Sequence, residues 1–193
     1  MADKPKVAIT MGDAAGIGPE ITVKCLAQPE VYQWCDPVVL GDARVMNEAI
    51  ALTGLPVGVY PIENISEAKF AHGAIDVLDY RNIDVENLRM GVVDAKNGEA
   101  AVLYTKEAGK MCLEGKVGAM VSAPLNKESM RAAGYKYEGQ TQILGELCGA
   151  KRYGMILLLG KLRLMLLTTH MSLREAIEKV KKDRVVSMVE LAW

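Results

Sequence analysis

The alternation of short apolar runs with amphipathic stretches is the feature that most constrains the fold of this 193-residue chain. Five runs have the composition of strands: residues 6–10, 37–40, 57–62, 75–78 and 117–121. Helical patterns lie between several of them, and parallel strands need such crossover connections. The order therefore predicts an α/β fold with a largely parallel sheet flanked by helices. Two further runs, 154–159 and 162–167, meet at Gly160 and predict a local antiparallel hairpin.

Capping residues mark the expected ends of two helices. Asp42 can accept a hydrogen bond from a free helix N–H, and Gly54 can end the same helix in a left-handed conformation. Asp94 or Asn97 opens a longer helix that Gly115 closes. These residues predict where the chain enters and leaves the helices between its strands.

The last segment predicts a helix that continues past the end of the chain. Ser172-Leu-Arg-Glu175 has the pattern of a capping box, and apolar residues recur at near-helical spacing up to Leu191-Ala-Trp193. A C-terminal helix docked by its tryptophan is the alternative. We expect a first α/β domain at residues 1–117 and the beginning of a second, truncated domain at residues 118–193.

Composition and charge exclude several classes of protein. The 23 basic and 24 acidic residues give a net charge of −1, so neither nucleic acid nor a membrane surface is an expected partner. The most apolar stretch, residues 155–167, is too short to span a bilayer and contains Lys161 and Arg163. Four cysteines without CxxC spacing give no zinc knuckle or redox pair. A cytoplasmic protein fits these features.

A glycine-rich segment, Gly12-Asp-Ala-Ala-Gly-Ile-Gly-Pro-Glu20, follows the first expected strand. Gly16 and Gly18 allow a tight turn and close approach of a ligand, and Pro19 suits the first turn of a helix. The spacing is neither the dinucleotide fingerprint nor a P-loop. From these residues alone, a ligand-binding loop and a plain strand–helix turn are equally supported.

Four segments in order resemble the 4-hydroxythreonine-4-phosphate dehydrogenase family, within the isocitrate and isopropylmalate dehydrogenase-like superfamily. They are the glycine-rich segment, Ser122-Ala-Pro-Leu-Asn-Lys-Glu128, Gly139-Gln-Thr-Gln142 and Thr168-Thr-His-Met-Ser-Leu-Arg174. Two positions depart from the family pattern. Ala14 replaces the usual proline, and Gln140 replaces a histidine, which leaves a neutral amide where an imidazole could carry charge. The resemblance covers nearly all of this chain and the N-terminal portion of a typical family member, so it implies an incomplete two-domain dehydrogenase architecture.

The resemblance implies an NAD(P)-dependent oxidoreductase that is assisted by a divalent metal (Zn, Mg or Co). The expected reaction is oxidation and decarboxylation of a phosphorylated hydroxy acid such as 4-phosphooxy-L-threonine, in pyridoxal phosphate biosynthesis or a related sugar-acid pathway. A homodimer is the expected assembly, because family members share their active sites between subunits.

The family motifs also imply roles for particular residues, and no catalytic residue is assigned. The implied substrate contacts are Asn126, Lys127, Gln140 and Thr141. The implied cofactor-binding residues are Asp13, Gly16 and Gly18, and the implied metal ligand is His170. Four of these residues have a structural alternative: Lys127 can be merely solvated, Gln140 and Thr141 can cap a helix, and His170 can bond the backbone near a helix start.

Two rival functions remain at this stage. The family supplies two further metal-binding histidines from beyond the last residue of this chain. The chain could therefore be a truncated or degenerate paralogue that acts as a binding or oligomerisation module without catalysis. The other rival is an unrelated phosphate-binding α/β transferase, which would bind nucleotide without metal-dependent reduction of NAD.

Overall fold

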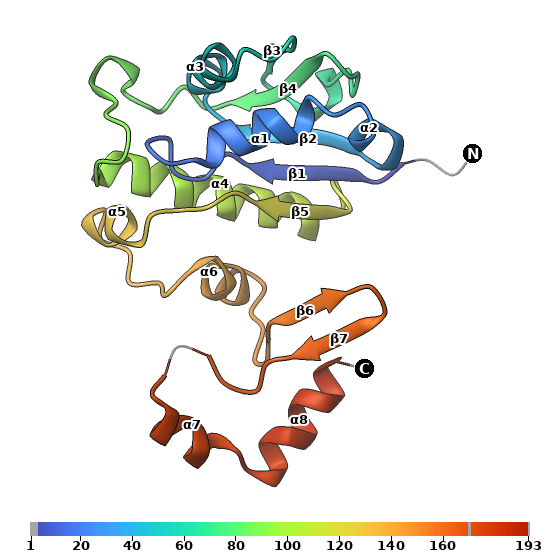
Figure 1. Ribbon diagram of the computed structural model, residues 1–193, viewed down its shortest axis with the longest axis vertical. Helices are drawn as coiled ribbons and strands as arrows, with labels where there is room; N and C mark the ends of the chain where they lie inside the picture. The colour runs from blue at the N-terminus through green and yellow to red at the C-terminus, as the bar shows by residue number, and fades with distance from the viewer. Residues whose placement is uncertain (1–3, 170, 193) are drawn as a thin grey trace. The chain divides into compact units, whose positions relative to one another are not determined.

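The computed structural model describes residues 4–169 and 171–192, and Figure 1 shows its elements. By compactness the chain divides into two units, Met1–Cys148 and Gly149–Trp193. The first unit contains a five-stranded sheet, and the second contains a two-stranded sheet with two helices.

All strand pairs in the sheet of the first unit are parallel, and the strand order is β3-β4-β2-β1-β5. The strands are β1 (Lys6–Thr10), β2 (Asp36–Gly41), β3 (Gly58–Ile62), β4 (Ala74–Asp79) and β5 (Ala119–Ser122). The central strands β1 and β2 are nearly continuous apolar runs, as expected for strands covered on both faces. The predicted α/β fold with a largely parallel sheet and a local hairpin is confirmed.

Helices cover both faces of this sheet. They are α1 (Gly18–Leu26), α2 (Val31–Trp34), α3 (Ala43–Thr53), α4 (Ala95–Leu113), α5 (Lys127–Ala132) and α6 (Gln140–Leu147), with short 3₁₀ turns η1 (Ile65–Glu67) and η2 (Val85–Asn87). The α1 crossover from β1 to β2 and the α4 crossover from β4 to β5 run in opposite directions along the sheet. Right-handed crossovers therefore place α1 and α4 on opposite faces, with α3 beside α1 and with α5 and α6 beside α4 (Figure 1).

The predicted caps of two helices are confirmed. The Asp42 carboxylate accepts from the backbone N–H of Arg44 at the start of α3, and Gly54 ends that helix with a φ of 64°. Of the two residues considered for α4, Asp94 is the N-cap and its carboxylate accepts from the N–H of Asn97. Short-range side-chain hydrogen bonding thus fixes where the chain leaves the sheet.

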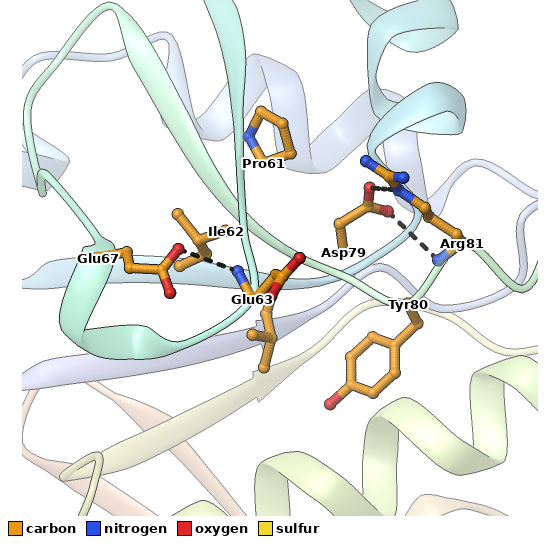
Figure 2. A pocket seen from close by; sticks show the side chains of 8 residues that line it. Pro61, Ile62, Glu63, Glu67, Asp79, Tyr80 and Arg81 are labelled. Atoms are coloured by element: carbon orange, nitrogen blue, oxygen red, sulfur yellow. Dashed lines mark hydrogen bonds and ion pairs between the residues drawn. The ribbon is translucent and has the colours of Figure 1, made fainter.

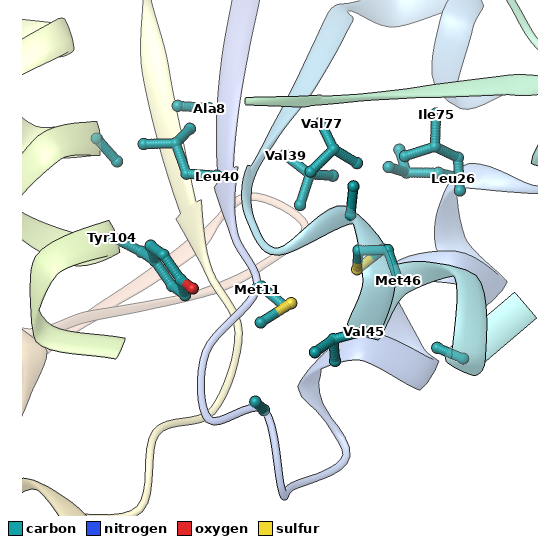
Figure 3. Close-up of a cluster of buried hydrophobic side chains, with 14 of the residues drawn as sticks. Ala8, Met11, Leu26, Val39, Leu40, Val45, Met46, Ile75, Val77 and Tyr104 are labelled. Atoms are coloured by element: carbon teal, nitrogen blue, oxygen red, sulfur yellow. The ribbon is translucent and has the colours of Figure 1, made fainter. Parts of the chain in front are cut away.

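The main core lies between the sheet and its helices (Figure 3). Leu40 and Val77 come from the strands, Met46 comes from α3 and Tyr104 comes from α4, and all four are fully buried. A smaller cluster of Val102, Met130 and Ile143 joins α4 to α5 and α6. These two clusters fix the helices relative to the sheet edge where the candidate site lies.

The second unit has local structure and little burial. Its elements are β6 (Ile156–Leu159), β7 (Leu162–Met165), α7 (Leu173–Lys179) and α8 (Lys182–Ala192). The antiparallel hairpin turns at Gly160 with a φ of 57°, and the capping box of Ser172 and Glu175 is present. None of the helical or strand residues described in this unit is buried.

The division between the units differs from the boundary expected near residue 118. Strand β5 pairs with β1, from Val7 opposite Ala119 to Thr10 opposite Ser122, and so completes the first sheet. Helices α5 and α6 then pack on α4. The first unit therefore extends to Cys148, while the limits of domains in a longer protein stay a prediction.

Within residues 4–169 and 171–192, none of the helices combines the length and the apolar character needed to cross a membrane.

Candidate functional site

The candidate site lies where the loops after β1 and β5 leave the sheet side by side. Strands β2, β4 and β3 lie on one side of β1, and β5 lies on the other side. The strand order therefore reverses between β1 and β5. Open α/β sheets bind ligands at such a crevice, outside the carboxyl ends of the strands. Two hydrogen bonds join the loops there: Asp13 N–H donates to the Pro124 carbonyl at 3.0 Å, and Ala123 N–H donates to the Thr10 carbonyl at 3.2 Å.

A cavity of about 220 Å³ occupies this crevice. It is lined by Asp13, Ala15, Gly16, Ile17, Gly91, Val92, Pro124, Leu125 and Asn126. The lining has no basic side chain, and most of its side chains are apolar. Three of the predicted site residues, Asp13, Gly16 and Asn126, therefore face one cavity although they come from two distant segments of the chain.

The glycines of the β1–α1 loop have different reasons to be glycine. A Cβ at Gly12 would overlap the Pro124 carbonyl, and a Cβ at Gly18 would overlap the Met11 carbonyl, so both are required by packing. At Gly16 a Cβ would meet only Asp13, no closer than 3.4 Å, and the φ of Gly16 is not left-handed. The fold tolerates a side chain at Gly16, so the missing side chain leaves space in the cavity. Gly18 is absent from the cavity lining and has a packing role.

Asp13 is an acid held almost completely away from solvent, with only 3% of its surface exposed. Its Oδ1 accepts from the Ala15 N–H at 2.8 Å. Burial raises the pKa of the Asp13 carboxyl, the Ala15 N–H and the Ser129 hydroxyl act in the opposite direction, and the nearby charge of Asp94 raises it further. The floor of the cavity therefore carries a carboxyl group whose charge is disfavoured by its surroundings.

The loop after β5 places Asn126 in the cavity lining and Lys127 outside it. Asn126 is the N-cap of α5, and its side-chain oxygen accepts from Glu128 N–H at 2.8 Å and from Ser129 N–H at 3.1 Å. Its side-chain oxygen is therefore occupied by capping. Lys127 is exposed at the start of α5, where a lysine is commonly solvated.

Gln140 reaches back to the same loop from α6. Its amide Nε2 donates to the carbonyl of Ala123 at 2.9 Å, and a carbonyl oxygen can only accept, so the orientation of the amide follows from chemistry. Thr141 is exposed. The alternative that Gln140 and Thr141 cap α6 is wrong, because Gly139 is the N-cap and no side chain bonds the free N–H groups there.

The predicted metal ligand His170 lies outside the described residues. Among residues 4–169 and 171–192, no group of three or more histidine, cysteine, aspartate or glutamate side chains is placed to hold a metal ion. The donor set that the structure describes therefore does not fit a divalent cation by itself.

Ser129 links three elements of the site and was not among the predicted residues. Its fully buried hydroxyl accepts from the Asp94 N–H at the start of α4 at 3.2 Å, and it also lowers the pKa of Asp13. Gly91 ties its own loop to the site by donating its N–H to the Ala15 carbonyl at 2.7 Å. A buried serine in a short helix gives no distinctive sequence signal, because its partners are 35 or more residues away.

Known proteins similar to this chain agree on one family. Residues 33–193 match the family described as "Pyridoxal phosphate biosynthetic protein PdxA". A protein of Symbiobacterium thermophilum, provisionally named D-threonate 4-phosphate dehydrogenase, is 40% identical over 189 residues, which cover 98% of this chain and 56% of that protein.

Solved structures show the same relationship. The crystal structure of a 4-hydroxythreonine-4-phosphate dehydrogenase from Burkholderia phymatum superposes with a TM-score of 0.89 at 40% identity, covering 97% of this chain and 56% of that one. The 4-hydroxythreonine-4-phosphate dehydrogenase of Klebsiella pneumoniae superposes with a TM-score of 0.91 at 35% identity, covering 100% of this chain and 58% of that one.

The chain thus spans a little over half the length of the relatives that it matches. The family match nevertheless includes β2 to β5, the Ala123–Gln140 contact and the whole second unit. On this agreement of sequence, fold and site, the chain belongs to the PdxA family of pyridoxal phosphate biosynthetic proteins.

Proposed function

We propose that this chain is part of an NAD(P)-dependent dehydrogenase that oxidises a phosphorylated hydroxy acid such as 4-phosphooxy-L-threonine, with loss of carbon dioxide from the oxidised product. Pyridoxal phosphate biosynthesis or a related sugar-acid pathway is the proposed setting. One observation carries the proposal: the loop predicted to bind cofactor and the loop predicted to bind substrate line the same cavity at the strand-order reversal. The relatives from Symbiobacterium thermophilum and Burkholderia phymatum are named as dehydrogenases of phosphorylated hydroxy acids, which supports the same reaction.

The cavity fits the nicotinamide end of the cofactor better than its phosphates. Gly16 leaves space that a side chain would fill, and Ile17, Val92 and Pro124 offer apolar contact to a flat ring. A pyrophosphate beside the buried Asp13 would lack a basic partner in the lining. Bound nicotinamide supplies the hydride acceptor, and the protein supplies position and charge.

Asn126 and Gln140 are the proposed polar contacts to the reactant. Since the Asn126 oxygen is occupied by two backbone N–H groups, its amide N–H groups remain for a ligand. Gln140 has one amide N–H committed to Ala123, which leaves its oxygen and one N–H. Both side chains are neutral and held by the protein, so they can orient a hydroxyl or carbonyl group by hydrogen bonding. Thr141 and Lys127, both exposed, stay proposed contacts for the phosphorylated end.

A divalent metal and a homodimer remain proposals from the family resemblance. His170 is the proposed metal ligand, but the described donor set does not complete a site, so no step of the proposed chemistry is assigned to a metal here. The comparison of turnover with and without Mg²⁺ or Zn²⁺, and of His170→Ala with the parent, tests the metal. Sedimentation of the chain tests the dimer, and fractionation of the producing cells tests the cytoplasmic location.

The decisive experiment measures cofactor binding and turnover separately. The 193-residue chain is titrated with NAD⁺ and with NADP⁺ by calorimetry, and production of reduced cofactor is followed with 4-phosphooxy-L-threonine. Turnover supports the dehydrogenase. Cofactor binding without turnover identifies a non-catalytic binding module, and binding of neither cofactor contradicts the proposal.

A matched pair of glycine variants locates the cofactor. Gly16→Ala adds a methyl group to the cavity and should weaken binding of NAD(P) about tenfold or more, because one methyl group changes the fit of a pocket by that order. Gly58→Ala, on strand β3 with nothing within 4 Å of the added carbon, is the control and should bind as the parent does. Equal affinity of Gly16→Ala and the parent would move the cofactor away from this cavity.

A further inference from the structure

A second cavity of about 550 Å³ lies at the carboxyl ends of the edge strand β3 and its neighbour β4 (Figure 2). The last paired residues of these strands are Ile62 and Leu78, after which the two segments of the chain separate. The chain after β3 turns into η1, and the chain after β4 turns back at Arg81. The cavity opens between these two segments, and its volume is within the range of small-molecule sites.

Arg81 is held at this cavity by a nearly buried acid. The Asp79 side chain, 7% exposed, accepts from the Arg81 Nε at 3.0 Å and from the Arg81 N–H at 3.3 Å, and it also accepts from the Ala43 N–H at 2.9 Å. Arg81 has a φ of 49°, a left-handed conformation that a residue other than glycine rarely adopts. The Nε bond to Asp79 sets the direction of the guanidinium, whose terminal nitrogens can still donate a bidentate pair of hydrogen bonds.

The segment after β3 also contributes two carboxylates to the cavity lining, those of Glu63 and Glu67. The Glu67 carboxylate is held by the Glu63 N–H, which donates to its Oε2 at 3.3 Å, and Glu63 itself is exposed. Figure 2 shows Glu67 on one side in this view and the Asp79–Arg81 pair on the other. Tyr80 adds an aromatic wall, and burial raises its pKa to about 12, so the phenol stays neutral.

These groups exclude the simplest ligands. An inorganic anion would meet more carboxylates than guanidinium groups, and the charge of Arg81 is already balanced by Asp79. A bare metal ion lacks a site, because the acids of the cavity are not among any described group of three that could hold one. A ligand that carries both an ammonium and a carboxylate satisfies both sides of the lining at once.

We propose that this cavity binds a free amino acid, with its carboxylate on the guanidinium of Arg81, its ammonium on Glu63 and Glu67, and its aliphatic part against Tyr80. A paired carboxylate and guanidinium share two hydrogen bonds in one plane, which fixes the ligand at one end. The ammonium donates charge-assisted hydrogen bonds to the two carboxylates. This site is separate from the crevice between β1 and β5 and does not depend on the proposed dehydrogenase activity.

The test uses the full chain and ligands of known charge. Backbone amide signals of ¹⁵N-labelled protein are followed while glycine, L-serine or L-lysine is added, with acetate and ethylammonium as probes that carry only one of the two charges. The zwitterions should give saturable shifts at residues 62–64 and 79–81, and the two single-charge probes should bind about tenfold or more weakly. Equal shifts with acetate, or no saturable shift with any of the three amino acids, would overturn the proposal.

Variants assign the two ends of the ligand. Arg81→Gln and Glu63→Gln should each weaken binding about tenfold or more, because each removes a charge-assisted contact. Arg131→Gln and Glu48→Gln, exposed residues outside the cavity, are the matched controls and should bind as the parent does. Arg81→Lys keeps the charge and serves where Arg81→Gln disturbs the turn. Unchanged affinity in Glu63→Gln, whose side chain is exposed, would contradict the assigned orientation.

Discussion

The two units of this chain contrast in how much apolar surface they bury. In the first unit Val38, Val39 and Leu40 of the central strand β2 are fully buried between two layers of helices. In the second unit Leu158, Leu159 and Leu162 of the hairpin are 67%, 77% and 60% exposed, and none of the described residues of its helices is buried. Both units nevertheless have well-formed caps and turns.

Local signals and burial therefore act separately in this molecule. The Gly160 turn and the Ser172 capping box need only neighbours in sequence, and they form although little packs against them. A capping hydrogen bond contributes on the order of 1 kcal/mol, whereas burial of one leucine contributes about 1.5–3 kcal/mol. We infer that global stability comes from the first unit and that the second contributes mainly local structure.

The largest expected effect compares one leucine from each unit. Leu40→Ala in β2 should lower the free energy of unfolding by about 2–5 kcal/mol, because the fully buried side chain leaves a cavity between the sheet and its helices. Leu158→Ala in β6 should change it by less than about 0.5 kcal/mol. Urea denaturation followed by circular dichroism measures both. A similar loss in both variants would show that the hairpin leucines are covered in solution.

The next effect separates packing from ligand space inside the first unit. Gly18→Ala should cost about 1–3 kcal/mol of stability, because its Cβ would overlap the Met11 carbonyl and the backbone must shift. Gly16→Ala should leave the free energy of unfolding within about 0.5 kcal/mol of the parent. Thermal denaturation of the two variants measures the difference. If Gly16→Ala proves equally destabilising, the space beside Asp13 is part of the packing and not a ligand cavity.

The strands and caps of the first unit could be predicted because their determinants are local. The run at residues 6–10 is strand β1 as predicted, and Asp42, Gly54 and Asp94 occupy the predicted caps. The continuation of the last helical pattern was predicted less well. Apolar spacing runs through residues 173–192, but Val180 has a ψ of 87° and separates α7 from α8.

The assembly of the site could be predicted only in part. The family motifs assign Asp13 to cofactor binding and Asn126 and Gln140 to substrate binding. The pairing of β5 with β1, which brings their segments together, depends on contacts more than 100 residues apart. Strand order and register are set by the packing of whole faces, which no single motif records. Ser129 and the cavity at Arg81 could not be predicted for the same reason. The partners of Ser129, Asp94 and Asp13, are distant from it in sequence, and so is Ala43 from Asp79, the acid that holds Arg81.

Acid pH should act on the first unit through Asp42. Its carboxylate is fully buried. Burial is the largest influence on its pKa and raises it, but the bonds from Arg44 and from the Ile83 N–H together outweigh burial, so the pKa is lowered from 3.8. A carboxyl group whose pKa is lower in the folded state than in the unfolded state stabilises the fold at pH values above the unfolded-state pKa. This stabilisation is lost as the pH falls below that value toward the folded-state pKa. Asp42→Asn should therefore cost about 1–3 kcal/mol at neutral pH and much less at pH below 3.8.

Asp13 has the opposite pH dependence, because its pKa is raised in the folded protein. Its contribution to the free energy of unfolding therefore falls as the pH rises above 3.8. Urea midpoints measured across this range for the parent, Asp42→Asn and Asp13→Asn separate the two carboxyls. A constant difference between Asp42→Asn and the parent at every pH would contradict the role given to the Asp42 charge.

The smallest expected effect is on the second unit. The Ser172 hydroxyl accepts from the Glu175 N–H, and the Glu175 carboxylate accepts from the Ser172 N–H at 3.0 Å. Ser172→Ala removes one half of this reciprocal cap and should loosen α7 by about 1 kcal/mol without moving the global denaturation midpoint. Amide hydrogen exchange distinguishes local loosening of α7 from global destabilisation, because protection should fall in residues 173–179 and stay unchanged in β1 and β2.

Ser129→Ala is the matched change in the first unit, where the buried hydroxyl joins α5 to the start of α4. In this variant the global denaturation midpoint should fall. If Ser172→Ala also lowered the global midpoint, the two units would unfold as one, and the separation of local structure from burial would not describe this chain.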